Sequence, residues 1–104
     1  RFEHMAAMAD AGISLLMGSD SGSTLSHGTF PSELQACVDA GIPASAVIAA
    51  ASWEGRHRLG FSALEEGSAA DVVVYSDDPR SDMSIVDSPR AIIRDGGLVS
   101  EATN

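Results

Sequence analysis

Apolar positions along the chain follow two different periods, and the period changes near Gly60. Between residues 2 and 9 the apolar side chains recur at helical spacing, and Gly12 predicts the end of that helix. The sequence ISLLM at 13–17 is a continuous apolar run, typical of parallel strands that are buried on both faces. Residues 19–29 are rich in serine and glycine and lack periodicity, which predicts a loop.

Two more helices are expected after this loop. Pro31 suits the first turn of one helix, where Ser32 and Gln35 resemble a capping box, and Gly41 closes it. Residues 43–60 predict a single longer helix with its terminal glycine at the C-cap. The residues expected on the inner faces are Leu34, Cys37 and Val38 of the first helix and Val47, Ile48, Ala51 and Leu59 of the second.

Beyond the second of these helices the pattern changes to short strands separated by turns. Apolar runs at 71–75 and 91–94 predict strands, and the sequence DGG at 95–97 predicts a hairpin turn before LVS. A lone parallel strand at 13–17 cannot satisfy both of its hydrogen-bonding edges, so it needs neighbours that this chain does not contain. The order of elements therefore indicates one end of a larger α/β enzyme.

The composition and net charge of the chain exclude some classes of binding partner. The chain has 104 residues, of which 15 are acidic and six are basic, giving a net charge of −9 at pH 7. Such a field repels phosphate backbones and anionic lipids, so neither nucleic acid nor a membrane is expected as a partner. The first residues lack the apolar core of a secretory signal, and the single cysteine, Cys37, has no partner for an internal disulfide. We expect a cytoplasmic protein.

Asp20 is the main candidate for chemistry, because it lies where the apolar run gives way to the glycine-flanked sequence GSDSG. Residue types alone leave three interpretations open. An aspartate in a nucleophile elbow would attack covalently, although the loop before Pro31 separates the strand from the next helix. A carboxylate at the end of a barrel strand binds a divalent metal such as Zn²⁺ and accepts a proton from its water. An Asx turn would only stabilise the loop.

The order of motifs resembles the amidohydrolase superfamily, specifically its imidazolonepropionase-like and Xaa-Pro dipeptidase-like metal-dependent hydrolases. The matching segments are GSDSG, HG, LQACVDAGI, AVIAAASWEGRHRLG, GSAADVVVYSDDP and RAIIRDGGLV, in that order along the chain. The resemblance implies an α/β fold in which residues 1–60 form the last strand and helices of a (β/α)8 TIM-like barrel. Residues 61–104 would then be strands of a small β-sandwich shared with a missing N-terminal part.

The resemblance also implies roles for individual residues. Asp20 matches the last-strand aspartate, which is catalytic because it binds the metal and handles the proton of the attacking water. His27 and Gly28 match a loop pair near the substrate, so His27 is a candidate substrate contact, with a solvent-exposed loop histidine as the alternative. Asp71 matches an aspartate with a structural role. The other metal ligands of the superfamily, among them an H-x-H pair, have no counterparts here. We therefore expect one or two divalent ions, zinc first, in the intact protein only.

The helix at 43–60 departs from the superfamily pattern. The bulky Trp53 and the charged Arg56, His57 and Arg58 stand where that pattern has small residues. Trp53 is expected to pack rather than to bind substrate, and His57 is expected on a solvated helix face. Because of these departures, the sequence does not identify the substrate.

The sequence thus predicts the C-terminal part of a metal-dependent enzyme that hydrolyses a C–N bond, amide or cyclic amide, with metal-activated water. The 104-residue piece alone is expected to be inactive. A non-catalytic structural or subunit-interface fragment is the alternative, and an Asp-nucleophile hydrolase is the third choice. The expected partners are a small-molecule substrate and the missing N-terminal part, and homo-oligomerisation stays open.

Overall fold

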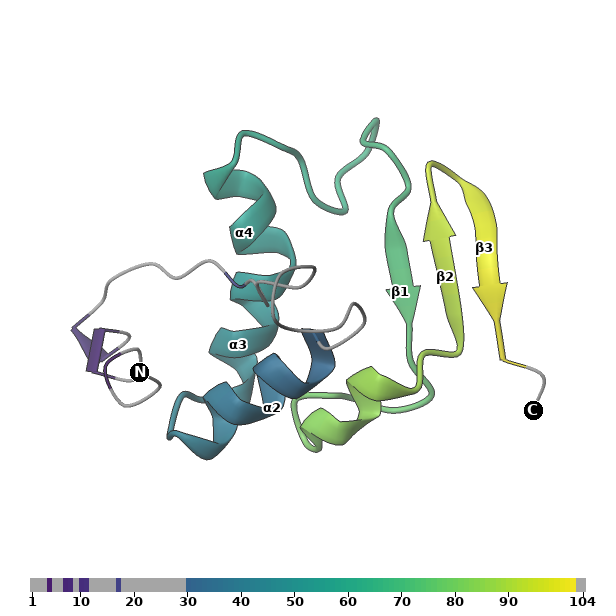
Figure 1. The fold of residues 1–104 in the computed structure, drawn as a ribbon. Coiled ribbons are helices and arrows are strands. Elements are labelled where there is room, and N and C mark those ends of the chain that lie inside the picture. The colour runs from purple at the N-terminus through teal and green to yellow at the C-terminus, as the bar shows by residue number, and fades with distance from the viewer. Residues whose placement is uncertain (1–3, 5–6, 9, 12–16, 18–29, 103–104) are drawn as a thin grey trace, which may run out of the picture.

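The computed structural model describes residues 4, 7–8, 10–11, 17 and 30–102. Residues 4, 7, 8 and 10 are helical, in agreement with the helix predicted there, whereas the strand predicted at 13–17 lies outside the described residues except for Met17. The later elements are α2 (Phe30–Asp39), α3 (Ala44–Ala51), α4 (Trp53–Arg58), β1 (Val72–Val74), the 3-10 helix η1 (Met83–Asp87), β2 (Ala91–Arg94) and β3 (Gly97–Glu101). The helices α2, α3 and α4 lie on one side and the sheet on the other, with β1 nearest these helices and η1 below the strands (Figure 1).

The first of the two predicted helices, α2, begins one residue before Pro31 and ends at Asp39, and the glycine predicted to close it, Gly41, follows two residues later. Gly41 has φ +105, and the N–H groups of Gly41 and Ile42 donate to the carbonyls of Val38 and Cys37. This is the Schellman pattern, in which a glycine in the left-handed region satisfies the last carbonyls of a helix.

The predicted capping box is wrong. Ser32 lies inside α2 rather than at its N-cap, because the helix begins at Phe30. The side chain of Gln35 donates instead to Asp39 over 2.9 Å, one turn further along the helix.

The single helix predicted at 43–60 is wrong, because the chain breaks at Ser52 into α3 and α4. Ser52 has φ −134 and ψ −105, and its hydroxyl donates to the carbonyl of Ile48 one turn earlier. A serine that bonds back in this way competes with the helical ladder. The predicted inward position of Leu59 is also wrong, since this side chain is 64% exposed. Gly60 does end the helix, as predicted.

The core lies between α2, the start of α3 and η1. Its buried residues are Leu34, Cys37, Ile42, Val47, Met83 and Val86. Leu34, Cys37 and Val47 confirm the predicted inner faces, whereas the two core residues from η1 were not predicted. Asp82 caps η1, because its carboxylate accepts from the backbone N–H of Ser84 at 3.0 Å.

The three strands form an antiparallel sheet in the order β1-β2-β3. The predicted hairpin is confirmed: Asp95 (φ 50) and Gly96 (φ 79) both have positive φ, as a tight turn between β2 and β3 requires. A bulge interrupts the register between Ile92 and Ile93. The described part is therefore a mixed helix and strand fold, as predicted, while the barrel and the β-sandwich stay predictions.

Candidate functional site

The predicted site residues Asp20, His27 and Gly28 lie outside the described residues. Met17, three positions before Asp20, is the nearest described residue on that side. Its sulfur lies 3.9 Å from the sulfur of the fully buried Cys37, and its side chain packs against the core. Met17 is thus held against α2 and the core.

Met17 also lines a cavity of about 280 Å³ beside the break between α3 and α4. The other lining residues are Ala50, Ala51, Ser52, Gly55, Arg56, Leu59 and Phe61. The lining is mostly apolar, with the charge of Arg56 at one side. Among the described residues that line it there is no His, Cys, Asp or Glu.

The described residues do not by themselves supply a metal centre. Across residues 4, 7–8, 10–11, 17 and 30–102, no group of three His, Cys, Asp or Glu side chains is close enough to hold an ion. His57 lies on the exposed face of α4, as predicted, and its Nε2 is 2.8 Å from Glu65. The hydrogen bond to His57 lowers the pKa of Glu65 from its usual value. The role of Asp20 as a metal ligand stays a prediction, because the residue lies outside this described part.

Arg56 connects α4 to the sheet, a role that the sequence reasoning missed. Its Nε donates to the carbonyl of Ser62 at 2.6 Å, its Nη1 lies 3.5 Å from Asp71, and its guanidinium lies 5.7 Å from the centre of the Phe61 ring. The other oxygen of Asp71 accepts from the backbone N–H of Asp95 at 2.8 Å. Asp71 thus has the structural position expected of it.

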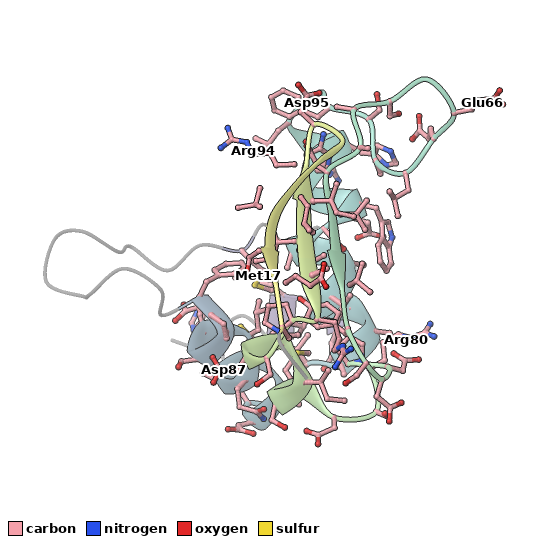
Figure 2. All side chains as sticks on the ribbon, turned by 90° about the vertical axis from the view of Figure 1, so that its right-hand side faces the viewer. Met17, Glu66, Arg80, Asp87, Arg94 and Asp95 are labelled. Carbon is pink, nitrogen blue, oxygen red and sulfur yellow. The ribbon has the colours of Figure 1, made fainter. Side chains whose placement is uncertain are left out.

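Charged residues also order the turn after β1. Arg80 makes a two-pronged contact with Asp78, with Nη2 at 2.8 Å and Nε at 3.0 Å from the two carboxylate oxygens. These hydrogen bonds lower the pKa of Asp78 to about 2. Figure 2 shows Arg80 and Asp87 at the opposite end of the molecule from Asp95 and Arg94. The contact between Arg80 and Asp78 fits the turn that the sequence SDDP predicts.

A groove of about 1060 Å³ lies between the helices and the sheet. Trp53, Leu64 and Val73 line it and are 45%, 76% and 45% exposed. Trp53 thus lies at the wall of this groove with nearly half of its surface exposed, and the packing role predicted for it stays a prediction. Among the described residues no helix has the length and apolar content that a bilayer span requires.

A comparison with known families shows which protein family the chain belongs to. The family model described as "Amidohydrolase family" matches residues 2–99, which is nearly the whole chain. The chain belongs to the amidohydrolase family. This result confirms the resemblance drawn from the six sequence motifs.

Solved structures place this amidohydrolase near the dipeptidases. A Xaa-Pro dipeptidase with methionine bound in its active site is 27% identical and covers 97% of the chain, with a TM-score of 0.84. A protein from Bifidobacterium longum, provisionally assigned as a prolidase, is 30% identical over 90% of the chain, with a TM-score of 0.79. The recognition of a Xaa-Pro dipeptidase-like relative is confirmed.

Sequence relatives of this amidohydrolase include uncharacterized proteins of Mycobacterium tuberculosis and Mycobacterium bovis. Each is 33% identical over 95 residues, which make up 91% of this chain. The chain spans only about a quarter of the length of these relatives, 26% of each, and 25% of each solved structure.

Proposed function

We propose that the intact protein is a metal-dependent hydrolase that cleaves a C–N bond in a small molecule, and that this chain forms its C-terminal part. The observation that carries the proposal is the amidohydrolase match over residues 2–99 together with the TM-score of 0.84 to a Xaa-Pro dipeptidase. The bond is an amide or a cyclic amide. The dipeptidase relatives favour the linear amide of a short peptide.

Asp20 is the residue of this chain with a direct part in the reaction. Its carboxylate binds the metal, accepts the proton that the attacking water loses and delivers it to the leaving nitrogen. When bound, a divalent ion such as Zn²⁺ would lower the pKa of its water to about 7. His27 and Gly28, on the same loop, contact the substrate.

The architecture proposed for the intact protein follows the family. Residues 1–60 complete a (β/α)8 barrel that brings Asp20 to the barrel mouth, and residues 61–104 complete a small β-sandwich. The remaining metal ligands come from the three quarters of the relatives' length that has no counterpart here. The piece alone is accordingly inactive, and the intact enzyme works in the cytoplasm on a small-molecule substrate.

The test uses the intact polypeptide, purified without added metal. Metal content is measured by mass spectrometry, and hydrolysis is assayed on Xaa-Pro dipeptides, other dipeptides and cyclic amides. The proposal expects bound divalent metal, turnover that a chelator abolishes and recovery when Zn²⁺ is restored. Turnover by a metal-free protein would instead support an Asp nucleophile. A metal-loaded protein without activity on any amide would contradict the proposed reaction.

A further inference from the structure

The hairpin turn between β2 and β3 holds the only Asp–Gly pair in the sequence, Asp95–Gly96. In such a pair the backbone nitrogen of the glycine attacks the side-chain carboxyl carbon of the aspartate. This attack forms a succinimide ring and releases water. Hydrolysis of the ring at the former backbone carbonyl takes the water up again and leaves an isoaspartate, so the reaction needs no other reagent. Glycine favours the attack, because no side chain shields its nitrogen.

The two reacting groups lie at the exposed tip of the hairpin. Asp95 and Gly96 are both exposed, and Figure 2 shows Asp95 at one end of the molecule. A Cβ added at Gly96 would meet no atom of the described residues within 4 Å. Crowding by neighbouring side chains therefore does not keep the carboxyl group and the nitrogen apart.

Two hydrogen bonds instead hold the backbone of the pair. The N–H of Gly96 donates to the carbonyl of Ala70 at 3.0 Å, and the N–H of Asp95 donates to the carboxylate of Asp71 at 2.8 Å. Closure of the ring rotates the peptide group that joins Asp95 to Gly96. This rotation turns the attacking nitrogen away from the Ala70 carbonyl, so the hydrogen bond has to break before the reaction proceeds.

The two acceptors are neighbours in the chain and belong to the segment that enters β1. Asp71 is itself held from the other side, because its second oxygen lies 3.5 Å from Nη1 of Arg56 on α4. The hairpin tip thus meets a fixed acceptor. Removing the Asp71 carboxylate frees the tip from this segment and makes the bond to Ala70 easier to break.

We propose that Asp95–Gly96 is a site of aspartyl isomerisation, which the carboxylate of Asp71 and the carbonyl of Ala70 hold unreacted while the hairpin is closed. An isoaspartate adds a methylene to the main chain inside the turn that joins the paired residues Arg94 and Gly97. A tight turn fixes the register of its strands through its length, so the reaction loosens the pairing of β2 with β3. The proposal does not depend on the proposed hydrolase.

The test follows isomerisation in the intact protein in mildly acidic buffer, since a carboxyl group loses its oxygen as water from the protonated form. Peptide mapping by mass spectrometry measures isoaspartate at Asp95 and, as the reference, at the exposed pair Asp87–Ser88. Asp71→Ala removes the acceptor of the Asp95 N–H, and Asp71→Asn keeps an oxygen there. Each protein is also incubated in denaturant.

Val86→Ala is the control for a general loss of stability. Val86 is a core residue that is 7% exposed, so its truncation destabilises the fold. It precedes Asp87, which Figure 2 shows at the opposite end of the molecule from Asp95. The variant therefore lowers the stability of the fold without touching the hairpin.

In denaturant we expect Asp95–Gly96 to isomerise faster than Asp87–Ser88, and at the same rate in every variant. In buffer we expect the wild-type protein to react at least about tenfold more slowly than in denaturant, because the closed hairpin protects the pair. Asp71→Ala is expected to react about tenfold faster than the wild type in buffer, the ratio that the loss of one hydrogen bond to a charged group gives. Asp71→Asn and Val86→Ala are expected to stay close to the wild-type rate.

Four results would overturn the proposal. In denaturant, a rate at Asp95–Gly96 no higher than at Asp87–Ser88 would remove the site, and equal wild-type rates in buffer and denaturant would remove the protection. An Asp71→Ala rate equal to that of the wild type or of Asp71→Asn would show that the acceptor oxygen has no part in it. An equal rise in Val86→Ala would assign the reaction to general unfolding. The readout needs no turnover, so it stands apart from the test of the proposed hydrolase.

Discussion

Asp71 accepts a hydrogen bond from the backbone N–H of Asp95 at 2.8 Å, although 24 residues separate the two along the chain. Asp95 is the first residue of the hairpin turn, and the N–H of the next residue, Gly96, donates to the carbonyl of Ala70 at 3.0 Å. The hairpin is therefore tied to the segment that enters β1. Through its other oxygen Asp71 also meets Arg56, so one carboxylate links the hairpin to α4.

Replacing Asp71 tests this link. Asp71→Ala removes the acceptor, and we expect it to lower the free energy of unfolding of the intact protein by about 1–3 kcal/mol, as for a hydrogen bond to a charged group. Asp71→Asn keeps an oxygen that accepts from Asp95 and is expected to cost clearly less. Chemical denaturation of both variants measures the difference. An equal loss of stability in the two variants would mean that Asp71 stabilises the fold through its negative charge, which faces Arg56.

Gly96 tests the turn itself. Gly96→Val puts a β-branched side chain at φ +79, where we expect a cost of about 1–2 kcal/mol from the left-handed conformation alone. Gly97→Ala is the matched control, because Gly97 does not have a positive φ and an added Cβ would meet only the Arg94 carbonyl, at 3.5 Å. Thermal unfolding and steady-state kinetics are measured on both. Loss of turnover with an unchanged melting temperature would place the hairpin in the active site.

The contact between Arg80 and Asp78 predicts a pH effect with a definite sign. The folded pKa of Asp78 is lowered to about 2, below its unfolded value, so the contact stabilises the fold above pH 4. That contribution is lost as pH falls from about 4 toward 2. Arg80→Gln is expected to return the pKa of Asp78 toward its ordinary value. Carboxyl NMR titration checks this, and an unchanged pKa would show that the arginine is not the cause.

The hairpin turn and the helix ends that carry a glycine were predictable because their causes are local. Gly41, Gly60 and the Asp95–Gly96 pair each carry the conformation that their sequence position implies. The break at Ser52 was missed, because one serine in an alanine-rich run gives no sign that its hydroxyl bonds back to Ile48. The core positions of Met83 and Val86 were missed because a 3-10 helix has too short an apolar period to detect.

For the candidate site, the sequence predicted the family but gave no sign of the contacts that Arg56 makes. The family could be recognised because six short motifs occur in a fixed order, and each of them reflects a local turn or a strand end. The role of Asp20 depends on ligands that no part of this sequence contains, so it stays a prediction. Arg56 gave no signal either, because its partners Ser62, Phe61 and Asp71 meet it only through the course of the chain after α4.

The measurement that tests the central claim most directly is steady-state kinetics, with metal analysis, on Asp20→Asn in the intact protein. Asparagine has nearly the same size but no basic oxygen, so we expect kcat to fall by at least about 10²-fold, with the fold retained and metal binding weakened. Ser19→Ala and Ser21→Ala, made separately, are the neighbouring controls and are expected to cost far less. Near-normal turnover in Asp20→Asn would contradict the account and leave Asp20 as a residue that only stabilises its loop.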